Sequence, residues 1–352
     1  MSAATRWWGP DLDDEQGAVR DMLDDFTAGH SLTLDDDRHL VGELVTELAE
    51  LGVWTVGTAE AAGGGGAERV TTALVFERLG RAWPALGWAS VQAHAAVDVL
   101  SGDERFETLV GALHTGESSV AVLDTSSSHV RVAIDGGRVT GTIDRLDAAG
   151  ESPYLVILDG DNRAVVIEQA AASFTPLRRT GLGGAFTRSA DIDADGARVL
   201  HVTDVDVDAA RTRLLLGAAC VAAGLAASAA AAALQYAAGR DQFGGALTDI
   251  PIVRLGLFEQ AAHSAVGLSA ALSAAAHPLT ALAVARSCCD SAVTVAAASL
   301  QSHGGYGYLT EYGAERRLRD AISLRAAVDP HGATAAAGRV YAGVPPVTEI
   351  PA

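Results

Sequence analysis

The stretch from Leu214 to Leu234, LLLGAACVAAGLAASAAAAAL, contains no charged side chain over 21 residues. A helix of this length is long enough to cross a lipid bilayer. Alanine dominates the stretch, however, and because alanine is small, neighbouring helices can pack closely on every side. Arg211 and Arg213 precede it, and the text that follows, QYAAGRDQFGG, contains no belt of anchoring aromatic residues. We therefore predict a buried central helix and no membrane span.

The pattern of apolar residues changes twice along the 352-residue chain. Up to about residue 115, apolar residues recur at helical spacing, as in VGELVTELAELGVW. Short segments such as SSVAVLD and PYLVILDG then alternate with turn residues, which favours about seven or eight strands. Helical text returns after residue 208, over 208–239, 251–275, 279–302 and 311–328, with a short segment after Pro330. We expect an α+β fold: an N-terminal helical domain (1–115), a central antiparallel β-barrel domain (116–207) and a C-terminal four-helix-bundle domain (208–352).

The composition excludes several classes of function. With 25 basic and 44 acidic residues the formal charge is -19, which repels nucleic-acid phosphate and anionic membranes. Every basic residue is an arginine, so a Schiff-base or phosphate-loop lysine is impossible. Three cysteines (Cys220, Cys288 and Cys289) are too few for a disulfide framework or a tetrahedral metal site. We therefore expect no metal site. Because the N-terminus has no apolar signal region, we also expect a cytoplasmic protein.

The segment YAAGRDQFGGALTDIP is the first that suggests ligand binding. A predicted long helix ends near Arg240 and is followed by Gln242, Phe243 and two glycines. An arginine in this place can simply complement the negative end of the helix dipole. Alternatively, its guanidinium presents a fork of donors to a pyrophosphate, with Phe243 as a flat neighbour for an aromatic ring.

The segment SLQSHGGYGYLTEYGAERRLRDA, residues 299–321, is the second. Gln301 lies near a predicted helix end, where its amide can hydrogen-bond a ligand. Gly304 and Gly305 either stop the helix or let the backbone come close to a ligand. Arg316 to Asp320 forms a charged cluster in the next helix, which we expect to fix that helix beneath the site.

These two segments, about sixty residues apart, resemble the motifs of the acyl-CoA dehydrogenase family. The family pattern is Arg, two residues and Phe-Gly, here RDQFGGAL. It continues with Gln, two residues, Gly-Gly and an Arg-Asp in the next helix, here QSHGGYGY and RRLRD. The N-terminal text and the helix, barrel, helix order are also similar, so the resemblance covers most of the chain. It implies FAD bound between subunits, with the ADP half held by Arg240, Gln242, Phe243, Gln301, Gly304 and Gly305.

The sequence departs from that family at the flavin-ring end. The aromatic residue that precedes Ile-Thr in the family is missing, and Leu146 and Asp147 stand near its place. The glutamate base that follows Arg-Asp in the family is missing as well. The nearest acidic candidate is Asp329, whose position before Pro330 is also typical of a helix stop. The second family position for the base is occupied by Leu214, and a leucine accepts no proton.

The intact motifs and the missing groups lead to three hypotheses. In the first, the chain is the non-catalytic subunit of an α2β2 heterotetramer, like the short paired subunits of bacterial steroid degradation. Such an assembly desaturates an acyl-CoA thioester, of which a steroid side-chain CoA is one example, and passes electrons to an electron-transfer flavoprotein. In the second, the chain is a self-sufficient homotetrameric dehydrogenase or oxidase with Asp329 as an atypical base. In the third, it is a flavin-free structural subunit.

Overall fold

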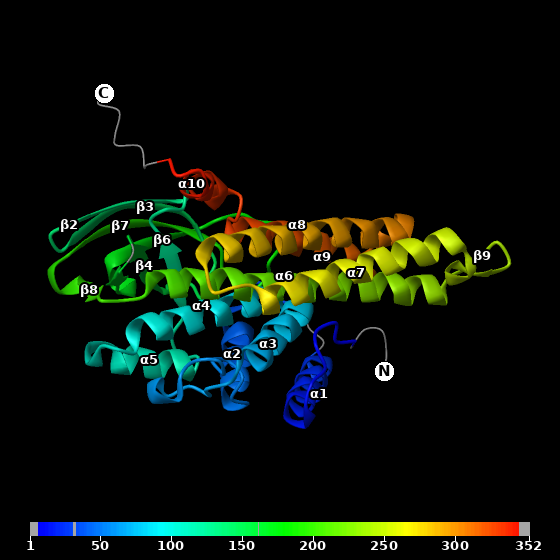
Figure 1. The fold of residues 1–352 in the computed structure, drawn as a ribbon, viewed down its shortest axis with the longest axis horizontal. Helices are drawn as coiled ribbons and strands as arrows, with labels where there is room; N and C mark the ends of the chain where they lie inside the picture. Colours follow the sequence, from blue (N-terminus) through cyan, green and yellow to red (C-terminus); the bar gives the residue numbers. More distant parts are fainter. Residues whose placement is uncertain (1–5, 31–32, 161, 345–352) are drawn as a thin grey trace.

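The computed structural model describes residues 6–30, 33–160 and 162–344. The chain forms helices first, then two β-sheets, then long helices again (Figure 1). The expected α+β order is therefore confirmed. The boundaries between helical and strand regions agree with the sequence pattern. Each change in hydrophobic period coincides with a change from helix to strand or back.

Five helices form the N-terminal region: α1 (Asp14–Gly29), α2 (Arg38–Glu50), α3 (Arg69–Ala82), α4 (Pro84–Leu100) and α5 (Glu107–His114). Acidic residues start the first two. The Asp13 carboxylate accepts a hydrogen bond from the Gln16 amide at 2.8 Å, and the Asp37 carboxylate accepts from His39 at 2.9 Å. Such N-caps satisfy backbone donors that have no partner within the helix. Part of the N-terminal acidity is thus structural.

The central region contains two four-stranded sheets. One has the order β1 (Val120–Asp124), β4 (Tyr154–Asp159), β5 (Arg163–Ile167), β8 (Val199–Thr203). The other has the order β2 (Val130–Asp135), β3 (Arg138–Leu146), β7 (Arg188–Asp195), β6 (Ala172–Pro176). Their inner faces share one apolar core, to which Leu155 and Ile157 of the first sheet and Ile143 and Ile192 of the second belong.

The antiparallel expectation holds for all described pairs of these sheets except one. Strand β1 runs parallel to β4, with Val120 opposite Tyr154. After β1 the chain passes through β2 and β3 in the other sheet, and it returns to enter the first sheet from the end at which β1 entered. Such a crossover makes the neighbouring strands parallel, so the wholly antiparallel barrel was wrong in this detail.

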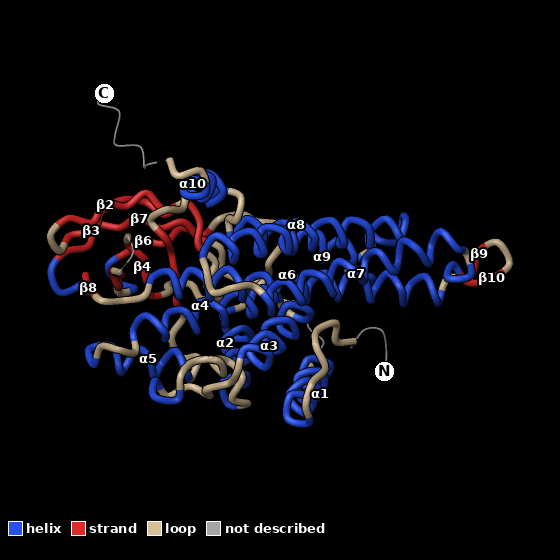
Figure 2. Tube along the Cα trace, in the orientation of Figure 1, coloured by secondary structure: helices blue, strands red, loops and turns tan. Residues whose placement is uncertain are grey.

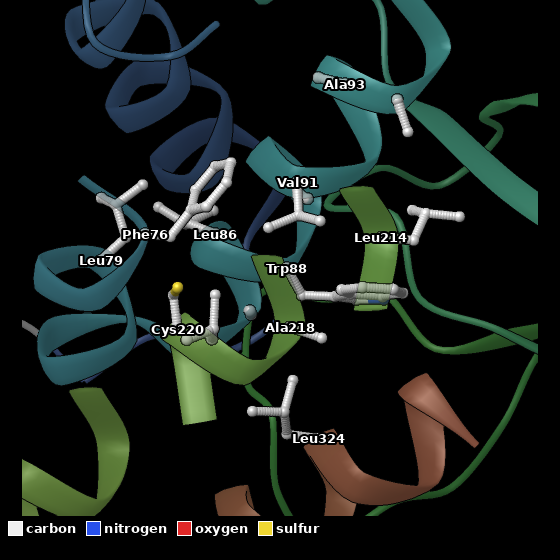
Figure 3. Close-up of a cluster of buried hydrophobic side chains, with 14 of the residues drawn as sticks. Phe76, Leu79, Leu86, Trp88, Val91, Ala93, Leu214, Ala218, Cys220 and Leu324 are labelled. Carbon is white, nitrogen blue, oxygen red and sulfur yellow. The ribbon is translucent and has the colours of Figure 1, made fainter. Parts of the chain in front are cut away.

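The C-terminal region consists of α6 (Val207–Gly239), α7 (Pro251–Ser273), α8 (Pro278–His303), α9 (Ala314–Val328) and α10 (Gly332–Tyr341). Helix α6 lies at the centre, and Figure 3 shows side chains of α3, α4 and α9 converging on it. A Cβ added at Gly224 would lie 2.0 Å from the Glu77 carbonyl oxygen, so α3 and α6 cross almost at backbone contact. The predicted buried central helix is confirmed.

Two described segments are long and apolar enough to cross a membrane by length and composition alone: 207–239 and 278–308. Within the first, 78% of the most apolar window is buried inside the protein, as expected of a core helix; within the second the share is 44%.

A hairpin of β9 (Asp241–Gln242) and β10 (Gly245–Ala246) joins α6 to α7. It lies at one end of the long helices, and the β-sheets lie at the other (Figures 1 and 2). The hairpin that carries the first motif is therefore far from the β-sheets (Figure 1).

Candidate functional site

The first motif forms the hairpin beyond α6. The helix ends at Gly239, and Arg240 follows with extended backbone (φ -107°, ψ 111°). Arg240 therefore lies just outside the last turn of α6, whereas the sequence favoured a place within that turn. The hairpin is closed by a hydrogen bond from the Leu247 amide to the Arg240 carbonyl oxygen at 2.9 Å.

The tip of the hairpin holds an aromatic residue in an unfavourable conformation. Both central residues of the two-residue turn have positive φ, 57° for Phe243 and 90° for Gly244. Turns of this kind favour Asn-Gly or Gly-Gly, because a side chain larger than that of asparagine strains the left-handed region. Phe243 is nonetheless 93% exposed, so no burial compensates for the strain. A strained and exposed aromatic residue is typical of a binding site.

The second motif ends α8. Gly304 has φ 56° and ψ -139°, which stops the helix after His303. The helix-stop interpretation is therefore correct, but it does not exclude a ligand. A Cβ built on Gly304 or Gly305 would meet no atom within 4 Å, so this backbone faces open space. Gln301, one turn earlier, is exposed.

The structure brings the two motifs together. The Arg240 Cζ atom lies 5.2 Å from the centre of the Tyr306 ring, and Tyr306 directly follows Gly305. Within the described residues, no carboxylate lies within ion-pair distance of Arg240. Its guanidinium donors are thus available to an anion beside the exposed Gly304–Gly305 backbone. Sequence reasoning did not assign Tyr306 a role; the contact with Arg240 identifies it.

The Arg316–Asp320 cluster anchors α9 to other parts of the fold. An Asp320 carboxylate oxygen accepts a hydrogen bond from the Leu182 amide at 2.6 Å, and Arg317 donates to the Ser228 hydroxyl of α6 at 3.1 Å. Arg319 donates to the Thr180 carbonyl oxygen. These contacts are consistent with the expectation that the cluster fixes α9. They run, however, to α6 and to the loop between β6 and β7, and not to the site itself.

A separate cavity of about 470 Å³ lies between β1, the start of α6 and the α9–α10 junction. Trp88, Leu214 and Leu282 give it apolar walls. Among its acidic lining residues, Asp124 pairs with Arg211 at 2.5 Å, and Asp208 pairs with the same arginine at 3.2 Å. Within the described lining, Asp329 is the acid that pairs with no arginine.

Asp329 ends α9 with a left-handed backbone (φ 48°, ψ 46°), as a helix-stop residue does. Its carboxylate accepts a hydrogen bond from the Gly332 amide at 3.0 Å at the start of α10. The Ser127 hydroxyl donates to the other carboxylate oxygen at 3.3 Å, and His129 Nε2 lies 3.6 Å from that oxygen. Both base positions considered from the sequence, Leu214 and Asp329, therefore line one cavity.

At the end of β3, the side chain and carbonyl of Asp147 are engaged by other groups of the protein. The Asp147 carboxylate pairs with Arg145 at 2.7 Å and also accepts a hydrogen bond from the Thr187 hydroxyl. Its backbone carbonyl accepts from the Gln92 amide group at 2.7 Å. Arg145 in turn donates to the Ser323 carbonyl oxygen of α9 at 3.1 Å, so it bridges the sheet and the helices.

Metal and thiol chemistry find no support in the described part of the chain. No group of three His, Cys, Asp or Glu residues there could hold a metal ion. The three cysteines are free and buried, and burial raises the pKa of the Cys288 thiol to about 12. A thiol with such a pKa is not a nucleophile at neutral pH.

The cavity and the arginine site belong to opposite ends of α6. Leu214 lines the cavity, and Arg240 follows 26 residues later at the other end of the helix. At about 1.5 Å per residue the two are about 39 Å apart. A single dinucleotide does not reach that far, so the two sites of one chain do not serve the same ligand molecule.

Comparison with known proteins gives these sites a context. Residues 13–102 match the N-terminal domain of acyl-CoA dehydrogenases, and residues 208–328 match their C-terminal domain. The two matches cover more than half of the chain, and the second includes both sequence motifs. The chain belongs to the acyl-CoA dehydrogenase family. The second match ends at Val328, directly before Asp329.

Curated relatives are similar along nearly their whole length. A probable acyl-CoA dehydrogenase of Bacillus subtilis is 24% identical, over 88% of this chain and 93% of that protein. The benzylmalonyl-CoA dehydrogenase of Aromatoleum aromaticum is 26% identical, also over 88% and 93%.

Solved structures share the fold. Butyryl-CoA dehydrogenase from Megasphaera elsdenii has a TM-score of 0.78 at 18% identity, covering 94% of this chain and 99% of that one. Glutaryl-CoA dehydrogenase from Mycobacterium smegmatis has a TM-score of 0.79 at 16% identity, with 95% and 96% covered. The fold of this acyl-CoA dehydrogenase family member is therefore that of its relatives.

Members of this family typically bind FAD. The hairpin and the α8 turn fit the ADP half of that cofactor, since they combine an arginine without an acidic partner, an exposed aromatic side chain and accessible backbone. The β3 end does not fit the flavin ring equally well, because Asp147 is fully engaged with Arg145 and Thr187.

Proposed function

We propose that this acyl-CoA dehydrogenase family member is the non-catalytic subunit of a cytoplasmic α2β2 flavoenzyme that desaturates an acyl-CoA between Cα and Cβ. The observation that carries the proposal is the distance of about 39 Å along α6 between Arg240 and the cavity at Leu214. The ADP-binding residues of one chain must then serve a cavity on another chain.

The composition of the cavity argues that the other chain is unlike this one. Two copies of this chain would pair an intact ADP site with a cavity in which leucine replaces one base and Asp329 caps α10. An unlike subunit that supplies a glutamate and a ring-binding strand would complete one site in each pair. Exposed apolar residues on α7 (Ile252, Leu255 and Phe258) support a large contact with another chain.

In this proposal the chain contributes binding and orientation. Arg240 would donate charge-assisted hydrogen bonds to the diphosphate, beside which the Gly304–Gly305 backbone would lie. Phe243 would provide an aromatic face for the adenine, and Gln301 would donate from its amide at the edge of the site. A bound FAD would supply the hydride acceptor for Cβ of the thioester substrate, and a base of the unlike subunit would take the proton from Cα.

A self-sufficient homotetramer with Asp329 as its base is the second candidate. It is favoured by one specific observation, namely that the Asp329 carboxylate lines the apolar cavity and pairs with no arginine. In either case we propose a bulky acyl group, such as a steroid side-chain CoA, as substrate. We also propose an electron-transfer flavoprotein as the acceptor.

The test is to purify the chain alone and together with a candidate acyl-CoA dehydrogenase-like partner subunit, and to measure mass and flavin absorbance. We expect no flavin in the chain alone, and an α2β2 complex with one FAD per unlike pair. A yellow homotetramer with about one FAD per chain that an acyl-CoA reduces would refute the partner role in favour of the second candidate. A flavin-free complex would instead indicate a structural subunit.

A further inference from the structure

Four aromatic rings meet beneath the arginine site. They come from α6 (Tyr236), from the end of α8 (His303) and from the two turns that follow it (Tyr306 and Tyr312). The Tyr236 and His303 rings lie 4.5 Å apart, and Tyr312 packs edge-on against Tyr236 at 5.7 Å. Because these residues come from four separate elements, the cluster joins the end of the long helix to the turn that carries Gly304 and Gly305.

Tyr306 occupies the outer edge of this aromatic cluster. Its ring centre lies 5.9 Å from that of Tyr312 and 6.5 Å from that of Tyr236, while 44% of the residue stays exposed. The Arg240 guanidinium lies over the same ring at 5.2 Å. Tyr312 and Tyr236 thus fix the Tyr306 ring, which presents a surface to the Arg240 guanidinium.

We infer that Tyr306 is a positioning residue that holds the Arg240 guanidinium beside the Gly304–Gly305 backbone, so that the two motifs form one preorganised site for a diphosphate. This inference rests on the proposed function. A free arginine side chain has many rotamers, and a ligand must order them when it binds. A cation–π contact that orders the side chain beforehand lowers that entropic cost, which increases affinity without a direct contact to the ligand.

The hydroxyl group of Tyr306 has no part in this role. Within the described residues it has no hydrogen-bond partner, so the ring alone makes the contact. Replacement by phenylalanine therefore keeps the positioning surface, whereas leucine keeps a similar apolar bulk and removes the ring. This difference separates positioning from simple packing.

The experiment is a titration of the flavin-depleted wild-type complex and its variants with FAD, followed by flavin fluorescence. We expect Tyr306→Leu to raise the Kd for FAD about fivefold, as the loss of a half-exposed cation–π contact implies. Tyr306→Phe should change it less than about twofold. On an Arg240→Ala background, Tyr306→Leu should have less than about a twofold further effect, because the group that it positions is gone.

Three results would overturn the inference. They are an unchanged Kd in Tyr306→Leu, an equal loss in Tyr306→Phe, or an undiminished effect of Tyr306→Leu on the Arg240→Ala background. If Arg240→Ala still weakens FAD binding in any of these cases, the proposed ADP site stands and only the role of Tyr306 falls. If the wild-type complex takes up no FAD, the proposed function itself fails.

Discussion

Replacing Phe243 by asparagine should stabilise the β9–β10 hairpin and weaken cofactor binding at the same time. Phe243 has a φ of 57°, and its side chain is 93% exposed. A left-handed backbone costs a bulky residue about 1–2 kcal/mol, whereas asparagine tolerates it better. Because almost no buried area is lost, we expect Phe243→Asn to stabilise the hairpin by about 0.5–1 kcal/mol.

The appropriate assay is hydrogen exchange at the Leu247 amide, which donates to the Arg240 carbonyl oxygen and so closes the hairpin. A gain of about 0.5–1 kcal/mol slows exchange through local opening by about two- to fivefold. Loss of an aromatic face from a nucleotide base raises the Kd for FAD by about tenfold. Global unfolding is a less suitable measure, because the hairpin lies at the end of the bundle and can open by itself.

Phe243→Ala is the matched control, since it removes the ring but keeps a side chain in the strained conformation. We expect it to lose FAD affinity like Phe243→Asn without the slower exchange at Leu247. Exchange in Phe243→Asn as fast as in the wild type would show that the turn stores no strain. An unchanged Kd for FAD in both variants would refute the role of the ring.

Three further predictions concern other parts of the molecule. Arg240→Ala should reduce flavin retention in the purified complex, since charge-assisted hydrogen bonds contribute about 1.5–3 kcal/mol each; Arg339→Ala on distant α10 is the control. Asp329→Asn should leave turnover within about tenfold, whereas loss of a true general base lowers it about 10²–10⁴-fold; a loss beyond a hundredfold with flavin retained would favour the self-sufficient enzyme. Burial lowers the pKa of His94 to about 3, so between about pH 6.5 and 3 the unfolded chain binds the extra proton and stability falls as pH falls. Denaturation should show a contribution of about 2 kcal/mol between pH 7.5 and 5 that His94→Gln removes.

The sequence by itself determined most of the fold. An uncharged alanine-rich segment gave the buried helix α6, because only small side chains allow α3 and its neighbours to pack that closely. The change from helical period to short β-branched segments marked the start of the sheets. Strand β7 follows the same rule, with Ala190, Ile192 and Ala194 alternately buried. Such patterns are local, and local patterns can be read from one chain.

The sequence also identified both motifs of the proposed ADP site. Arg240 and Gln301 lie in two segments whose glycines and order along the chain indicate a ligand-binding site from the sequence alone. The two motifs do not by themselves show which contact joins Arg240 to the turn after α8. Tyr306 contacts Arg240 only because α6 and α8 end side by side, and the spacing of 66 residues between the two does not encode that contact.

Only the tertiary structure decided the parallel pairing of β1 with β4 and the relation between the two sites. Strand direction depends on how the chain returns to a sheet, which a hydrophobic pattern does not contain. Likewise, Leu214 and Asp329 are 115 residues apart in sequence but line one cavity, whereas Leu214 and Arg240 share a helix and lie at its opposite ends. Sequence separation fixes distance within one helix, but between elements packing brings together whichever faces are apolar.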